Sequence, residues 1–203
     1  MVVSGYRIGA TTIHVVRQPW IEAPVDALVL SANNHLWLRN SSGNAAALHR
    51  SCPDLHDEVM ASVPAGGLRP GEGLVTRGPG RAVIHAVTVS YYRNVDGLVA
   101  GTSSVAEACE YALDAAAKHG FRSLAFSPMA LRGHAAGLVP AGIAPVWLPA
   151  VQAGVFVSFL ATGRALLLER IDFCIDKGIP PALQSSITAA FTNAVQVLSQ
   201  ASR

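Results

Sequence analysis

Apolar and polar residues alternate in blocks along the chain, and the blocks have the lengths of strands and helices. Short branched runs bounded by Gly, Pro, Asn or Ser predict buried strands, and apolar residues recurring every three or four positions predict helices. The predicted strands are Thr11–Val16, Val25–Leu30, Gly73–Thr76, Ala82–Val89, Leu124–Ser127 and Ile171–Ile175. Three of the predicted helices are Ala45–Arg50, Pro53–Ser62 and Ala150–Leu160. Another runs from a Ser104 cap to Gly120, because Glu107 follows Ser104 at the spacing of a capping box. The last has the apolar face Leu183, Ile187, Phe191, Val195 and Leu198.

This alternation of strands and helices favours an α/β fold. It predicts a mostly parallel sheet covered by helices on both faces. No internal repeat, low-complexity tract or linker interrupts the order, so we expect a single domain over residues 1–203.

The stretch from Val25 to Arg50 has the pattern of a ligand-binding loop. Its apolar strand turns polar at Ser31, runs through a loop of small residues up to Asn44, and continues as an Ala-rich helix. A strand followed by such a loop and a helix N-terminus can direct several backbone N–H groups at one anion. In open α/β sheets, ligands bind beyond the carboxyl ends of the strands. The pattern therefore predicts a small-molecule pocket whose favoured guest is a phosphate or another anion.

Composition narrows the class of protein. Half of the residues are hydrophobic (51%) and 14% are charged, which is typical of a well-buried globular chain. The net charge of +2 and the scattered Lys and Arg residues argue against a nucleic-acid partner. Three distant cysteines without a CxxC spacing predict reduced thiols, with no disulfide and no metal site, in a cytoplasmic protein. The first 16 residues lack the features of a signal peptide.

The segment 133–163 contains no Asp, Glu, Lys or Arg. That length suggests a membrane span, but Pro140, Pro145 and Pro149 interrupt it, and the unbroken part Ala150–Leu160 is too short to cross a bilayer. We expect no membrane association. The segment is instead a buried helix or one half of a subunit interface, which makes a homodimer possible.

Several of these pieces, in this order, resemble the macrodomain family. They are Val25-Asp26-Ala27, Ala32-Asn33-Asn34, Gly71 with Thr76, and Val83-Ile84-His85-Ala86-Val87, and the likeness extends from Thr12 to about Leu198. The resemblance implies a three-layer α/β/α sandwich with a mixed, mostly parallel sheet. It also implies ADP-ribose or an ADP-ribosylated group as the ligand. Some members of that family hydrolyse ADP-ribosyl esters or O-acetyl-ADP-ribose, and others only bind.

The chain departs from the family pattern at both acidic positions that the resemblance would assign to the site. Gln18-Pro19-Trp20 stands where the family places the Asp that holds adenine, and Ala45 stands where hydrolases place the Asp that helps activate water. A methyl group can neither accept a proton nor orient water. The segment Leu38–Asn40 has the character of an insertion of about two residues. The second loop, Leu131–Leu138, keeps Gly133 but lacks the family's first glycine and its ribose-packing aromatic residue.

The two loops define the candidate site. Ligand-binding candidates come from the first loop and the second loop: Asn33, Asn34, Arg39, Ser41, Ser42, Gly43, Asn44, Arg132 and Gly133. Arg side chains can replace backbone donors as an anion clamp. Asn33 and His134 are the catalytic candidates if the protein turns over a substrate. For Asn33 and Asn34 the alternative is a pair that caps the strand end, and for the arginines it is a solvated loop.

Three functions are compatible with these residues. The first, which we favour, is a binding module for ADP-ribose or a related nucleotide or phosphorylated small molecule. The second is an enzyme with a re-lined pocket that acts on a different small molecule, either hydrolase-like or repurposed. The third is a non-catalytic scaffold in which the uncharged segment 133–163 forms a dimer face. None of the three calls for a cofactor.

Overall fold

A computed structural model describes residues 1–39, 41–78, 80–91, 98–99, 102–131, 144, 146–163 and 167–201. Its strands are β1 (Val2–Ile8), β2 (Thr11–Arg17), β3 (Ala27–Asn33), β4 (Gly73–Arg77), β5 (Ala82–Tyr91), β6 (Leu98–Val99), β7 (Ser123–Phe126) and β8 (Arg170–Ile175). Its helices are the 3-10 turn η1 (Trp20–Glu22), α1 (Gly43–Ser51), α2 (Leu55–Ser62), α3 (Thr102–His119), α5 (Trp147–Ala161) and α6 (Pro181–Ala201).

The strands form a mixed sheet in the order β1-β2-β8-β7-β3-β5-β4, with β6 paired to β5. The five inner strands, β2, β8, β7, β3 and β5, are parallel to one another, and the edge strands β1 and β4 are antiparallel to them. The carboxyl ends of the parallel strands therefore meet at one edge of the sheet. This arrangement confirms the expected mixed, mostly parallel sheet.

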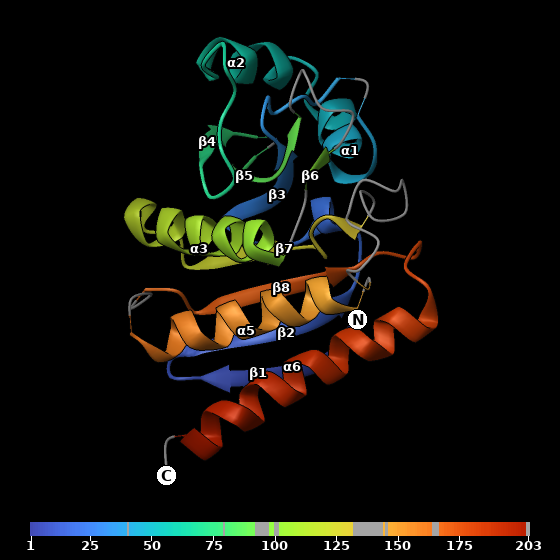
Figure 1. Cartoon of the computed structure of the whole chain (residues 1–203), viewed down its shortest axis with the longest axis vertical. Helices are drawn as coiled ribbons and strands as arrows, with labels where there is room; N and C mark the ends of the chain where they lie inside the picture. Colours follow the sequence, from blue (N-terminus) through green and yellow to red (C-terminus); the bar gives the residue numbers. More distant parts are fainter. Residues whose placement is uncertain are drawn as a thin grey trace.

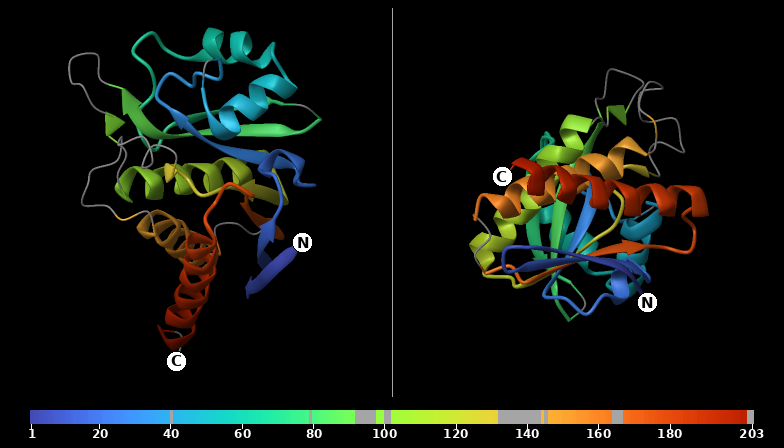
Figure 2. Two further views of the ribbon diagram at one scale, coloured as in Figure 1. Left: turned by 90° about the vertical axis from the view of Figure 1, so that its right-hand side faces the viewer. Right: turned by 90° about the horizontal axis from the view of Figure 1, so that it is seen from below.

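Helices cover the sheet on both faces, as Figures 1 and 2 show. Alternate side chains of β3 enter two separate cores because successive strand residues point to opposite faces. Ala27 and Val29 pack with α3, α5 and α6, whereas Leu28 and Leu30 pack with α1, α2 and η1. The result is the three-layer α/β/α sandwich expected from the sequence.

The uncharged helix of segment 133–163 is a core element. The described part, α5, lies between α3 and α6 and contacts both. Its Phe156 is completely buried and packs against aromatic rings of β7, β8 and α6. The structure thus follows the buried-helix alternative for residues 147–161. Within the described ranges, no helix is long and apolar enough to span a membrane.

Two sequence predictions differ from the structure. The predicted Ser104 cap is wrong, because α3 begins at Thr102 and Ser104 is a buried residue inside the helix. The strand β1 was not predicted. It forms a hairpin with β2 through Gly9 and Ala10, and Gly9 adopts the positive φ of 58° that this tight turn requires.

Candidate functional site

The candidate site lies where β3 and β7, neighbours in the sheet, reach their carboxyl ends (Figure 1). The loop after β3 runs to the start of α1, and the loop after β7 begins at Ser127. Asp26 links the amino ends of the same two strands. Its Oδ2 accepts hydrogen bonds from the backbone N–H of Arg122 (2.8 Å) and of Ser123 (2.9 Å). The polar loops that could hold a ligand therefore lie at the carboxyl edge.

Asn33, the last residue of β3, shapes the first loop. Its Oδ1 accepts hydrogen bonds from the backbone N–H of His35 (3.0 Å) and Trp37 (3.3 Å). Between them, Leu36 takes a positive φ of 53° and is completely buried. This is the strand-end capping that was the alternative to ligand contact. The role of the Asn33 amide nitrogen in binding stays a prediction.

Asn34 is buried, and its backbone is bonded on both sides. It is 4% exposed, its N–H donates to the carbonyl of Val89 (2.8 Å), and its carbonyl accepts from the N–H of Leu68 (2.7 Å). A Cβ on Gly67 would lie 2.8 Å from the Asn34 carbonyl oxygen, so the loop around Gly67 packs directly on this residue. Asn34 joins the first loop to β5 and to the segment before β4.

Two further candidates of the first loop make contacts away from the crevice. The Arg39 guanidinium is 3.4 Å from Asp57 of α2, and both side chains are exposed. The Ser41 hydroxyl donates to the carbonyl of Trp37 (2.6 Å) and closes the loop on itself. The Trp37 ring, 42% exposed, stacks on His35 with ring centres 4.9 Å apart.

Ser42, Gly43 and Asn44 form the N-terminus of α1. Ser42 is extended (φ −124°, ψ 169°) and its side chain makes no capping hydrogen bond, while Gly43 has a φ of 62°. Asn44 donates from Nδ2 to the hydroxyl of Ser127, at 2.7 Å. This bond fixes the first turn of α1 beside the carboxyl end of β7. The backbone N–H groups of that turn are the kind of donor set that binds anions.

The second loop is anchored by a residue that the sequence patterns did not single out. Gln152 of α5 is completely buried; its Nε2 donates to the carbonyl of Ser127 (3.2 Å) and its Oε1 accepts from the N–H of Met129 (2.9 Å). Ala130 follows with a positive φ of 58°, and its N–H donates to the hydroxyl of Ser31 on β3 (3.4 Å). A lone amide inside an otherwise apolar helix was the signal available in the sequence.

The predicted residues Arg132, Gly133 and His134 lie outside the described residues. Of the remaining candidates, the structure brings Asn33, Ser42, Gly43 and Asn44 to the carboxyl edge beside Ser127. It turns Arg39 towards α2, and it bonds the backbone of Asn34 to β5. Trp20, in the segment that replaces the family's adenine-holding Asp, is 2% exposed and donates from Nε1 to the carbonyl of Ala125 (3.0 Å), so it is a core residue.

The stretches of sequence that carry the two loops are one-sided in charge. Residues 27–53 and 115–168 contain no Asp or Glu. Arg39, Arg132, His35 and His134 all come from these segments. An anionic guest therefore meets no carboxylate from either of them, and neither segment offers a carboxylate as a general base.

A separate groove of about 450 Å³ lies on the opposite side of β8 from this crevice. Its lining comes from β1, the ends of β2 and β8, and α6: Val3, Arg17, Ile175, Gln184, Ser185, Thr188, Ala189, Thr192 and Asn193. None of the predicted site residues lines it.

Comparison with known proteins points to one fold. Residues 29–133, which are 105 of the 203, match the sequence model of the Macro domain family. The Oceanobacillus iheyensis macrodomain with ADP superposes with a TM-score of 0.73 at 16% identity, over 95% of this chain and 96% of that chain. The Trypanosoma brucei macrodomain in complex with ADP-ribose superposes with a TM-score of 0.63 at 21% identity, over 90% of this chain and 68% of that chain. No curated protein sequence gives a significant match.

Proposed function

Because the chain belongs to the macrodomain family, we propose that it binds ADP-ribose or a closely related nucleotide between the ends of β3 and β7. Similar structures contain ADP or ADP-ribose, which makes this ligand class the natural first candidate. The observation that carries the proposal is the hydrogen bond from Asn44 to Ser127, at 2.7 Å. It holds the N-terminus of α1 at the mouth of the parallel strands, where α/β proteins bind ligands.

A diphosphate suits this position electrostatically. The positive end of the α1 dipole and the N–H groups of its first turn favour an anion, and Ser42 does not occupy them with its side chain. The sequence segments that carry the two loops, residues 27–53 and 115–168, contain no carboxylate. A cationic or neutral apolar guest would gain nothing from this arrangement.

We propose binding without efficient hydrolysis. The position that the family resemblance assigns to a water-activating Asp is Ala45, and neither segment supplies another carboxylate. The Oδ1 atom of Asn33 is committed to two backbone N–H groups, so it is not available to orient a water. Catalysis by Asn33 and His134 stays the competing hypothesis.

Isothermal titration calorimetry with ADP-ribose tests the binding function. We expect a dissociation constant in the micromolar range for the wild-type chain and about tenfold weaker binding for Asn44→Ala, since about 1.4 kcal/mol is lost with one such positioning hydrogen bond. Ser51→Ala is the control, because it removes an exposed side-chain hydrogen bond at the C-terminal end of the same helix, away from the crevice. The absence of heat up to millimolar ADP-ribose would overturn the proposal.

A turnover assay separates binding from hydrolysis. The chain is incubated with a protein that carries ADP-ribose in ester linkage to Glu, and release is followed by mass spectrometry. We expect release at the rate of the uncatalysed reaction. Release that is faster and is abolished by Asn33→Ala or His134→Ala, while ADP-ribose still binds, would instead support the enzyme.

A further inference from the structure

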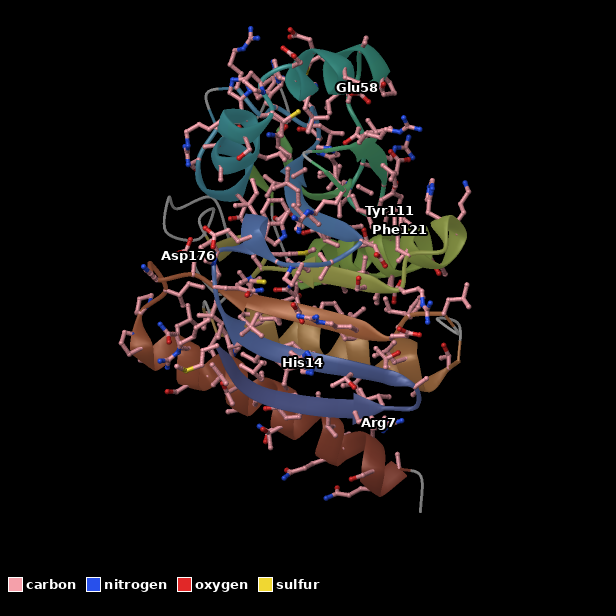
Figure 3. The ribbon with its side chains drawn as sticks, turned by 180° about the vertical axis from the view of Figure 1, so that it is seen from behind. Arg7, His14, Glu58, Tyr111, Phe121 and Asp176 are labelled. Carbon is pink, nitrogen blue, oxygen red and sulfur yellow. The ribbon has the colours of Figure 1, made fainter. Side chains whose placement is uncertain are left out.

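The edge strand β1 and the helix α6 beside it form a surface unlike the rest of the molecule. β1 pairs only with β2, so among the described strands one row of its backbone N–H and C=O groups has no neighbour. Figure 3 shows β1 as the last strand of the sheet, with α6 crossing the opposite face and running on past it. We call the open edge of β1 together with the solvent side of α6 the β1–α6 face. On α6 this side consists of Ala182, Ser185, Ala189, Asn193, Gln196, Val197 and Gln200.

Strand and helix are joined rigidly at this face. The Tyr6 hydroxyl lies 3.1 Å from the carbonyl oxygen of Thr188 and 3.0 Å from the hydroxyl of Thr192. The Tyr6 ring also stacks on Phe191, which is completely buried. A partner that docks here therefore meets a preformed surface and loses little conformational entropy on binding.

Apart from a register irregularity between Val2 and Ser4, β1 lacks the usual protection of an exposed edge. Natural edge strands are short, charged or interrupted by proline. The opposite edge, β4, has five residues and ends in Arg77. β1 has seven residues with a single charge, Arg7, and its Val2 and Val3 side chains are 58% and 41% exposed. A register irregularity between Val2 and Ser4 leaves Ser4–Ile8 as the regular pairing segment.

The helix contributes an uncharged surface. None of the 21 residues of α6 is Asp, Glu, Lys or Arg, although 14% of the whole chain is charged. Its solvent side combines small and amide side chains with Val197, which is 66% exposed. Helices that face only water normally carry charges on that side. An uncharged exposed side is typical of a helix that is covered.

We propose that the β1–α6 face is covered by a second copy of this chain, through antiparallel pairing of the two β1 strands about a twofold axis. A twofold interface places each patch opposite its own copy, so a charged patch would repel itself and a neutral one does not. The twofold axis is perpendicular to the sheet. It therefore places α6 and its counterpart on the same face of the joined sheet. Nucleic acids and charged peptides would find no complementary charge on α6.

The size of the face is sufficient for a specific dimer. A 21-residue helix is about 30 Å long, and a strand with a packed helix layer is about 20 Å deep, giving about 600 Å² per partner. The total of about 1,200 Å² exceeds the roughly 1,000 Å² needed for a specific interface. The groove between α6 and the start of β1, about 450 Å³, leaves room for a side chain of the partner.

Light scattering coupled to size-exclusion chromatography tests the proposal on the full chain. We expect twice the mass of one chain at micromolar concentrations. The double variant Val3→Lys/Val197→Lys should weaken association by roughly 100-fold, because it sets like charges across the axis. Leu167→Lys, 59% exposed before β8, is the matched control and should stay dimeric. Circular dichroism checks that each variant is folded.

Hydrogen exchange gives a second measurement that needs no variant. Amides of residues 2–8 and 182–200 should exchange more slowly at high than at low protein concentration, while those of β4 should not change. A monomer at every concentration overturns the proposal. So does a dimer that the double variant leaves intact, or one whose concentration-dependent protection lies outside the β1–α6 face.

Discussion

Acidification should destabilise the protein through one buried histidine. His85 lies in β5, is completely buried, and forms a 2.9 Å hydrogen bond between its Nε2 and the hydroxyl of Thr76 on β4. Burial lowers the pKa of His85 from 6.5 to about 4, because the charged imidazolium would lose its hydration. The unfolded chain, in which this histidine is hydrated, takes up its proton near pH 6.5.

The sign and size of the effect follow from this difference. Between pH 6.5 and pH 4 the unfolded state binds one more proton than the folded state, so the free energy of unfolding falls as the pH falls. Above pH 6.5 His85 is neutral in both the folded and the unfolded state, so none of this free energy of unfolding is lost. Each pH unit within the window costs about 1.4 kcal/mol, so about 2 kcal/mol is lost at pH 5 and about 3 kcal/mol at pH 4.

Urea denaturation at pH 7, 6 and 5 measures this loss. The comparison is with His85→Gln, whose amide can still reach the Thr76 hydroxyl but does not titrate. We expect the variant to be less stable than the wild type at pH 7 and to lose about 2 kcal/mol less between pH 7 and pH 5. Parallel losses of stability in the two proteins would refute the reasoning.

Two substitutions test the supports of the site. Gln152→Leu removes the partners of the half-buried Ser127 carbonyl and the buried Met129 N–H, so the free energy of unfolding in urea should fall by about 2–4 kcal/mol. An unchanged midpoint would show that these bonds are not made. Gly73→Ala places a Cβ against the His85 carbonyl oxygen and the Tyr111 ring, and should lower the unfolding free energy by about 3 kcal/mol or more. A thermal melt of Gly73→Ala that matches the wild type would contradict the close approach of β4 to β5.

The fold could be predicted from the sequence because the inner strands carry an unambiguous signal. Residues 27–30 are apolar on both faces of β3, and residues 82–87 are apolar except for His85, as buried parallel strands require. The edge strand β1 escaped detection because only one of its faces is covered, so its apolar residues are few and mixed with Ser4, Gly5 and Arg7. The Ser104 cap failed because a capping-box spacing also occurs inside helices.

The site was less predictable, since sequence spacing does not determine where a side chain points. The position of Asn33 at the strand end was predicted, but its Oδ1 caps two backbone N–H groups of its own loop. Arg39 was expected to face the crevice, whereas its guanidinium lies near a carboxylate on α2 that is 18 residues away along the chain. The links from Asn44 to Ser127 and from Gln152 to the second loop join distant segments, and no local pattern encodes such contacts.

The most direct test is to follow backbone amide chemical shifts of the isotope-labelled chain while ADP-ribose is added. We predict that the largest shifts fall on residues 33–44 and 127–134, the two loops at the carboxyl ends of β3 and β7. Residues 182–200 of α6 should not change. Shifts confined to the groove between β1 and α6, or no shifts at saturating ADP-ribose, would contradict a nucleotide site at the carboxyl ends of β3 and β7.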